Sequence, residues 1–157
     1  MEKNMTYAKK HLGQHFLKNK AKLRKIIDAL ELKAGDVVIE IGPGRGALTF
    51  PLAEKCKELD CKIIAIEKDK ELASELKEKF KDNKNVEIIE GDALKEIKSQ
   101  ISNLKNVKIV GNIPYYITGY LFRILGELEY KPSLIVLLIQ KEVAERVSAK
   151  PPKMNLL

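Results

Sequence analysis

Five short apolar runs, separated by segments with helical periodicity, constrain the fold of this chain more than any other feature. Each run has the length and composition of a strand, and a helix-like segment follows it within a few residues. Strands and helices that alternate with short connections form a parallel sheet covered on both faces, because parallel neighbours need a crossover. We therefore predict a doubly wound, mostly parallel α/β sheet. The predicted strands are 37–41, 62–66, 86–89, 107–111 and 134–139, and the predicted helices are 20–31, 47–57, 69–80, 94–102, 118–128 and 141–148.

A basic N-terminal arm is the main asymmetry of charge. The chain has 157 residues, enough for one domain with a buried core, and a formal net charge of +7. Residues 1–25 hold eight Lys or Arg against one acid, and the remaining charges balance. Such a block is typical of contact with nucleic acid, although a solvated tail has the same composition. We predict an arm over 1–18, with RNA contacts at Lys9, Lys10 and Lys18, and a domain over 19–157.

Several other classes of protein are disfavoured. The arm lacks the apolar segment of a signal peptide, and no apolar run reaches the roughly 20 residues that cross a bilayer. Cys56 and Cys61 do not make a metal framework, because the two histidines, His11 and His15, both lie in the arm. We therefore expect reduced thiols in a cytoplasmic protein, with no metal and no membrane contact.

A glycine-rich turn follows the first predicted strand. Gly42, Gly44 and Ala47 satisfy the pattern G-x-G-x-x-A, in which glycines let a ligand approach the backbone. Glu67 ends the second strand, where a carboxylate can accept two hydrogen bonds from ribose hydroxyls. The glycines could instead make only a tight turn, and Glu67 could cap the next helix. Together they favour a nucleoside ligand, either a dinucleotide or S-adenosylmethionine.

Two more polar groups follow the third and fourth predicted strands. Asp92 can accept a hydrogen bond from an adenine amino group, or it can cap the following helix. Asn112-Ile113-Pro114-Tyr115 follows the fourth strand, and the proline ends the ladder there. An amide, two carbonyls and a ring then lie at the edge where open α/β sheets bind ligands. Acids after strands two and three, with N-x-P-Y after strand four, are typical of S-adenosylmethionine-dependent amino methyltransferases.

Taken in order along the chain, these motifs resemble the ribosomal RNA adenine dimethylase family, which methylates two adjacent adenines near the 3′ end of small-subunit rRNA. The resemblance covers nearly the whole chain and implies the Rossmann-like fold of class I methyltransferases. It also implies an S-adenosylmethionine cofactor, the small ribosomal subunit as partner, and a monomer. The matching segments are residues 12–17, 40–46, 67, 91–93, 112–115 and 140–144.

The resemblance also implies roles for particular residues. His15 and Leu17 would close over the methionine and ribose side of the cofactor, and the backbone at Gly42 and Gly44 would contact it. Glu67 would hold the ribose hydroxyls and Asp92 the cofactor adenine. Asn112 would lie between the cofactor and the target base.

A methyl-transfer mechanism follows from these roles. The Asn112 side-chain oxygen and a backbone carbonyl near Ile113 or Pro114 would accept the amino hydrogens of the target adenine. That favours a pyramidal nitrogen whose lone pair is available for in-line attack, and positioning of this kind can contribute roughly 7–11 kcal/mol. Tyr115 would stack on the flipped-out base, whereas Tyr116 is expected to pack inward.

Family members continue with further strands and a small helical C-terminal domain, so we expect a truncated chain with an exposed apolar edge at the fifth strand. Weakened cofactor binding and poor rRNA methylation follow from that expectation. Two alternatives stay open. One is a large-subunit rRNA adenine methyltransferase of the antibiotic-resistance type, which shares N-x-P-Y. The other is a non-catalytic rRNA-binding or ribosome-assembly module.

Overall fold

A single parallel sheet organises the structure. The computed structural model describes residues 19–102 and 104–150. The strand order is β3-β2-β1-β4-β5, and every neighbouring pair is parallel. The elements are α1 (Lys20–Ala29), β1 (Val37–Ile41), α2 (Thr49–Leu59), β2 (Lys62–Glu67), α3 (Lys70–Phe80), β3 (Val86–Glu90), α4 (Ala93–Ile101), β4 (Val107–Asn112), α5 (Tyr115–Glu127), β5 (Leu134–Leu138) and α6 (Lys141–Val147).

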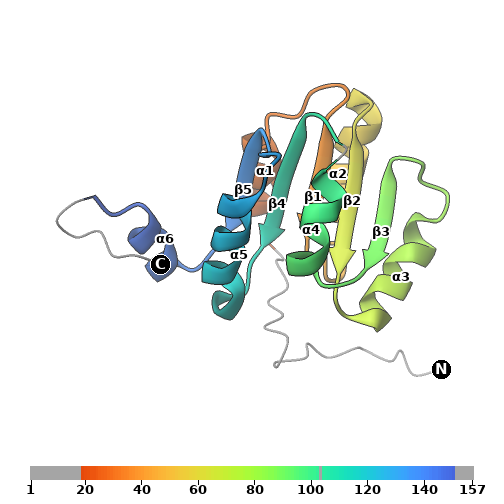
Figure 1. The fold of residues 1–157 in the computed structure, drawn as a ribbon. Coiled ribbons are helices and arrows are strands. Elements are labelled where there is room, and N and C mark those ends of the chain that lie inside the picture. The colour runs from red at the N-terminus through yellow and green to blue at the C-terminus, as the bar shows by residue number, and fades with distance from the viewer. Residues whose placement is uncertain (1–18, 103, 151–157) are drawn as a thin grey trace.

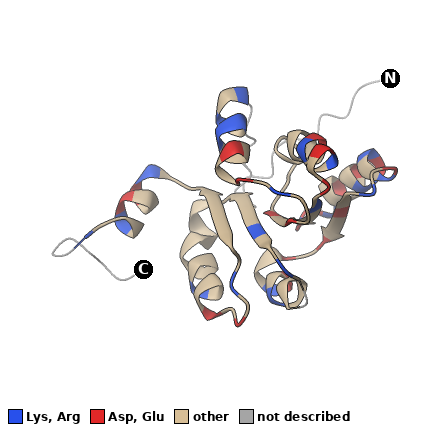
Figure 2. Ribbon diagram, turned by 90° about the horizontal axis from the view of Figure 1, so that it is seen from above, with Lys and Arg blue, Asp and Glu red and all other residues tan. Residues whose placement is uncertain are grey.

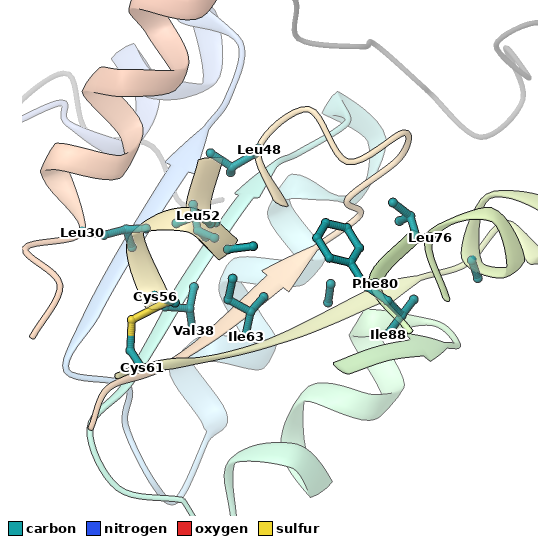
Figure 3. Packing of buried hydrophobic residues seen from close by; sticks show 14 residues of the cluster. Leu30, Val38, Leu48, Leu52, Cys56, Cys61, Ile63, Leu76, Phe80 and Ile88 are labelled. Carbon is teal, nitrogen blue, oxygen red and sulfur yellow. A yellow bond between two sulfur atoms is a disulfide. The ribbon is translucent and has the colours of Figure 1, made fainter. Parts of the chain in front are cut away.

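Helices cover both faces of the sheet, as predicted (Figure 1). One apolar cluster lies between the sheet and helices α2 and α3, which contribute Leu52, Leu76 and Phe80 (Figure 3). A second cluster on the opposite face includes Ile97 of α4 and Leu121 of α5. The three central strands, β1, β2 and β4, are buried from both sides, so they are mostly apolar along their length rather than alternating.

The strands after β3 are added on the other side of β1, so the strand order reverses between β1 and β4. From β1 the chain builds outward through β2 to β3, and then returns to pair β4 with the other side of β1. Such a switch point splays the two connecting loops apart, and open α/β sheets bind ligands in that crevice. The fold therefore brings together the carboxyl ends of strands that are far apart in the sequence.

Most element boundaries agree with the prediction, and the clearest difference concerns α5. The sequence predicts a helix from Thr118, but α5 begins at Tyr115, directly after Pro114. Pro114 has φ −60° and ψ 143° and takes the N-cap position, where its lack of an N–H group is harmless. Both Tyr115 and Tyr116 therefore lie in the first turn of the helix.

The last strand, β5, lies at the edge of the sheet. Its apolar run gave the prediction of a buried strand, yet the structure leaves it mostly half-buried, with Ile135 39% exposed. On the described part of the chain, only β4 pairs with it. The sequence also predicts that the fifth strand presents an apolar edge, and the structure agrees with that expectation.

Cys56 and Cys61 are joined in a disulfide (Figure 3), which contradicts the expectation of reduced thiols. The local turn explains their proximity. Helix α2 ends at Asp60, whose φ of 55° is left-handed, and the Cys61 N–H donates to the Cys56 carbonyl at 3.0 Å. This reversal brings the two Cα atoms to 4.5 Å, within the range that a disulfide needs.

Charged residues are distributed unevenly between helices and strands. Figure 2 shows basic and acidic residues interspersed along the outer helices, whereas the strands are mostly uncharged. An exception is Lys108 of β4, which is buried and pairs with Asp36 at 2.8 Å. Lys108 Nζ also donates to the carbonyls of Leu30 and Glu31 at 2.8 and 2.6 Å, which ties the end of α1 to the sheet.

Candidate functional site

A cavity opens at the carboxyl edge of the sheet, and the ends of four strands line it. Six of the residues predicted from the sequence lie there together. The cavity also has an apolar side, to which Ile26 of α1 and Ile117 of α5 contribute. The predicted residues on its lining are Gly42, Gly44, Glu67, Asp92, Asn112 and Pro114.

The glycine-rich turn shapes one wall of the cavity. Gly42, Gly44 and Gly46 have φ values of 66°, 61° and 86°, a left-handed backbone conformation that residues other than glycine rarely adopt. The Gly42 N–H donates to the Ile66 carbonyl at 3.0 Å, so the turn is anchored to β2. A Cβ atom built on Gly42 meets nothing within 4 Å. The space beside this backbone is therefore available to a ligand.

Glu67 is buried at the end of β2 and is fixed by backbone groups. Its Oε2 accepts from the Gly44 N–H and its Oε1 from the Asp69 N–H, both at 2.8 Å. A carboxylate has about four acceptor positions, so each oxygen can still accept a second bond. Glu67 thus holds the turn in place and keeps capacity for ligand hydroxyls. Asp69, not Glu67, caps α3, since its side chain accepts from the N–H groups of Glu71 and Leu72.

Asp92 combines the two roles that the sequence left open. Its Oδ1 accepts from the Leu94 N–H at 3.1 Å and caps α4, while Oδ2 accepts from Lys68 Nζ at 2.9 Å. Burial alone would raise the pKa of Asp92, but the Lys68 and Leu94 hydrogen bonds and the charges of Lys68 and Lys95 together lower it. The carboxylate is therefore ionised at neutral pH and faces the cavity.

The end of β4 carries Asn112, which is half-buried and lies on the cavity lining. Pairing with β5 fixes this backbone, because Asn112 is in register with Leu138 and the Ile113 N–H donates to the Leu138 carbonyl at 2.9 Å. The Pro114 carbonyl already accepts from the Ile117 N–H at 3.3 Å and from Thr118 Oγ1 at 3.0 Å. Since a carbonyl has two lone pairs, the Ile113 carbonyl is the better candidate acceptor of the two.

The two tyrosines after Pro114 differ from expectation. Tyr116 does not pack inward: it is 61% exposed and lines the cavity. Tyr115 is 55% exposed and does not contribute to the lining. Helical geometry explains this, because residues 115 and 116 lie about 100° apart around α5.

Two charged residues on the lining were not singled out by the sequence. Lys68 is one of them. It directly follows Glu67 at the end of the second strand, and that position at the sheet edge is the signal that could have predicted it. Glu40 is buried in β1 beside the cavity, and its Oε2 has no hydrogen-bond partner among the described residues. Burial raises the pKa of Glu40 to about 8; the nearby Thr49 hydroxyl lowers it in part and the charge of Glu67 raises it.

Some predicted residues lie outside the described part of the chain. These are the cofactor residues His15 and Leu17 and the RNA-contacting residues Lys9, Lys10 and Lys18. Within residues 19–102 and 104–150, no group of three or more His, Cys, Asp or Glu is arranged to hold a metal ion. The helices described there are also too short or too polar to span a membrane.

The parallel sheet with its switch point, the glycine turn and the acids at two neighbouring strand ends define the fold of class I S-adenosylmethionine-dependent methyltransferases. Within that class, the chain belongs to the ribosomal RNA adenine dimethylase family, whose model matches residues 5–155. The predicted fold and family are therefore confirmed.

Individual relatives agree with this assignment. A ribosomal RNA small subunit methyltransferase A from Dehalococcoides mccartyi is 43% identical over 159 residues, which cover all of this chain and 53% of the relative. The chain spans about half the length of the curated relatives it matches. A dimethyladenosine transferase from Plasmodium falciparum has a TM-score of 0.70 and 37% identity, covering 87% of this chain and 47% of that one. The 23S rRNA methyltransferase ErmE has a TM-score of 0.69 and 28% identity, covering 84% and 50%.

Proposed function

We propose that this chain binds S-adenosylmethionine at the carboxyl edge of its sheet and contributes the catalytic half of an rRNA adenine N6,N6-dimethyltransferase. The observation that carries the proposal is the meeting of four strand ends in one cavity. Glu67 and Asn112 end β2 and β4, Gly42 directly follows β1, Asp92 lies two residues after β3, and all four lie on one lining. A compact nucleoside lying across the switch point would touch all four.

The described residues fit this cofactor group by group. Glu67 retains acceptor capacity for the ribose hydroxyls, and ionised Asp92 offers Oδ2 to the adenine amino group. The open space beside Gly42 accommodates the chain that links ribose to methionine. The apolar side of the cavity, which includes Leu94 and Ile117, suits the faces of the adenine ring. His15 and Leu17 would complete the methionine side.

Asn112 would make the target amino group reactive. When bound, S-adenosylmethionine supplies an electrophilic methyl group on a sulfonium. The lone pair of adenine N6 is delocalised into the ring, so the nitrogen is a weak nucleophile in the planar form. The Asn112 side-chain oxygen and the Ile113 carbonyl would accept its two hydrogens and favour a pyramidal nitrogen. Neither group needs to act as a strong base, because the nitrogen loses its proton readily once it is methylated.

Aromatic side chains would hold the target base in place. We propose that Tyr115 stacks on the flipped-out adenine, at a gain of about 1–3 kcal/mol. Pro114 fixes the start of α5 and so sets the direction of this ring. Tyr116, which lies on the cavity lining and is exposed, would border the target base on the side of the neighbouring nucleotides.

The substrate would be the 3′ region of small-subunit rRNA, in the cytoplasm, with the protein acting as a monomer. The family match and the 43% identity to a small-subunit methyltransferase support this choice over the large subunit, for which ErmE provides 28% identity. The basic arm, through Lys9, Lys10 and Lys18, would add electrostatic contact with the RNA backbone.

Labelled methyl transfer to isolated ribosomal subunits tests the proposal. A chimera that continues this chain with the C-terminal portion of the Dehalococcoides mccartyi relative supplies the half that the alignment leaves uncovered. We expect dimethyladenine in the small subunit and none in the large one. Asn112→Ala in the chimera should lower transfer by roughly 100-fold or more while S-adenosylmethionine still binds. Retained transfer in that variant, or label in the large subunit alone, would contradict the proposal.

A further inference from the structure

Helix α5 has an exposed face that only partly belongs to the proposed methyl-transfer site, because Tyr116 lines the cavity whereas Tyr120 and Arg123 do not. Tyr116, Tyr120 and Arg123 are spaced by four and three residues, so they follow one face of the helix. Tyr116 is 61% and Tyr120 49% exposed, and Arg123 is exposed as well. The opposite face of α5 buries Leu121 and Leu125 against the sheet. We call Tyr116, Tyr120 and Arg123 the α5 strip.

The strip combines aromatic rings with a planar cation. The Arg123 guanidinium carbon lies 4.7 Å from the centroid of the Tyr120 ring, a cation–π contact. Gly119, which has no side chain, borders a hollow that Tyr120, Phe122 and Arg123 also line. A Cβ atom built on Gly119 meets nothing within 4 Å. A flat group could therefore enter beside the Tyr120 ring, with a positive charge next to it.

The strip is continuous with the proposed target-base site. Tyr116 lines the cavity at the carboxyl edge, and α5 begins directly after Pro114. From Tyr116 to Arg123 the helix rises about 10 Å, which matches about three stacked nucleotides at roughly 3.4 Å each. A strand whose target adenine is in the cavity would thus have its neighbouring nucleotides within reach of the strip.

We propose that the α5 strip binds the nucleotides flanking the target adenine, as single-stranded RNA. Bases stack on Tyr116 and Tyr120, and Arg123, which lies beside the Tyr120 ring, pairs with the phosphate of the nucleotide on Tyr120. Stacking on aromatic rings tolerates any base, so the strip would guide the strand without reading its sequence. Because this inference rests on the proposed function, its test has to separate a failure of the strip from a failure of the methyl-transfer site.

Fluorescent RNA oligonucleotides provide the test. The probe is a single strand of about ten nucleotides with two adjacent adenines at its centre. Matched probes carry abasic sites on one or the other flank, which remove the base and keep the phosphate. Anisotropy with the whole chain gives the dissociation constant for each probe. The protein variants are Tyr120→Ala, Tyr120→Phe, Arg123→Ala and, as a control, Tyr130→Ala, which removes a tyrosine 53% exposed outside α5.

We expect Tyr120→Ala to weaken binding of the intact probe about fivefold or more, and to have little effect on a probe that is abasic on the flank contacting the strip. Tyr120→Phe should bind like the wild type, because the ring remains. Arg123→Ala should weaken all probes and flatten their salt dependence. Urea denaturation of each variant establishes that the chain still folds.

Three results would overturn the inference. The first is equal weakening by Tyr120→Ala on intact and abasic probes. The second is an equal loss in Tyr130→Ala, and the third is unchanged affinity in Tyr120→Ala and Arg123→Ala, as expected if the strip packs against protein. Replacing the two central adenines by uridine tests the target site separately. Equal binding of that probe, with a strip effect intact, would count against the methyl-transfer site and not against the strip.

Discussion

Lys68 Nζ donates a hydrogen bond to Asp92 Oδ2 at 2.9 Å, across the cavity edge where the proposed cofactor adenine needs an acceptor. The other oxygen of Asp92 is occupied by the N-terminus of α4. Lys68 is mostly exposed, so water screens the pair and its contribution to stability is small. An adenine amino group would therefore share Oδ2 with Lys68 or displace it.

Substituting Lys68→Met should tighten S-adenosylmethionine binding by up to about fivefold, because a surface ion pair contributes roughly 0–1 kcal/mol that the cofactor has to offset. Calorimetry at two salt concentrations measures this. The wild type should gain affinity as salt rises, and the variant should not. Lys70→Met, which removes the same charge two residues away, is the matched control. Weaker binding in Lys68→Met would mean that Lys68 itself holds the cofactor.

Gly111 precedes Asn112 on β4 and has no room for a side chain. A Cβ atom there would lie 2.8 Å from Ile113 Cδ1 and 2.9 Å from the Ile41 carbonyl oxygen, which belongs to the neighbouring strand. Gly111→Ala should therefore destabilise the fold by about 1–3 kcal/mol and displace Asn112. Urea denaturation and cofactor binding both report the change.

A matched glycine substitution on α5 gives the contrast. Gly119→Ala adds a Cβ atom that meets nothing within 4 Å, in a helix where Ala is favoured over Gly. It should stabilise the fold by up to about 1 kcal/mol. Equal unfolding free energies for the Gly111 and Gly119 variants would contradict the crowding described at Gly111.

The buried pair of Lys108 and Asp36 should matter more for stability than exposed pairs. Asp36→Ala leaves the Lys108 ammonium buried with only the carbonyls of Leu30 and Glu31, so we expect a loss of about 3–5 kcal/mol in urea denaturation. Glu58→Ala, which breaks the exposed pair with Lys55, should change stability by less than about 1 kcal/mol. Similar losses in both variants would show that water reaches Lys108.

Sequence patterns were sufficient for the strands and for the residues that end them. Glycine turns, Asp92 and Asn112 sit next to apolar runs, so their position in the chain fixes their position at the sheet edge. Contacts between distant segments were not accessible in this way. Nothing local indicates that Ile26 of α1 reaches the cavity or that Lys68 pairs with Asp92. Those depend on tertiary packing.

The start of α5 predicted from the sequence is also wrong, by three residues. The proline predicts a break after β4, with residues 115–117 in a loop before the helix. Pro114 instead serves as the N-cap, which turns Tyr115 and Tyr116 outward on the helix surface. The α5 strip follows from this shift, because the helix then carries exposed rings from its first turn onward.

Glu40 predicts a pH dependence of folding. Its pKa in the folded state is about 8, above the ordinary value of 4.5, because burial disfavours the charged form. The folded state thus binds more protons between these values, and stability should fall as pH rises through that window, by roughly 1 kcal/mol per pH unit. Glu40→Gln keeps the shape and removes the titration. Urea denaturation of both proteins at several pH values should give curves that diverge upward from about pH 5; parallel curves would contradict a neutral, buried Glu40.

Calorimetric titration of the chain with S-adenosylmethionine and with NAD determines which of the two cofactors this cavity binds. A dinucleotide and this cofactor both suit a glycine turn and Glu67, but Asp92 and Asn112 at the next two strand ends favour the compact nucleoside. We predict one site for S-adenosylmethionine, weakened by Asp92→Ala, and no measurable binding of NAD. Tighter binding of NAD, or S-adenosylmethionine affinity that is unchanged in Asp92→Ala, would contradict a site for S-adenosylmethionine at this sheet edge.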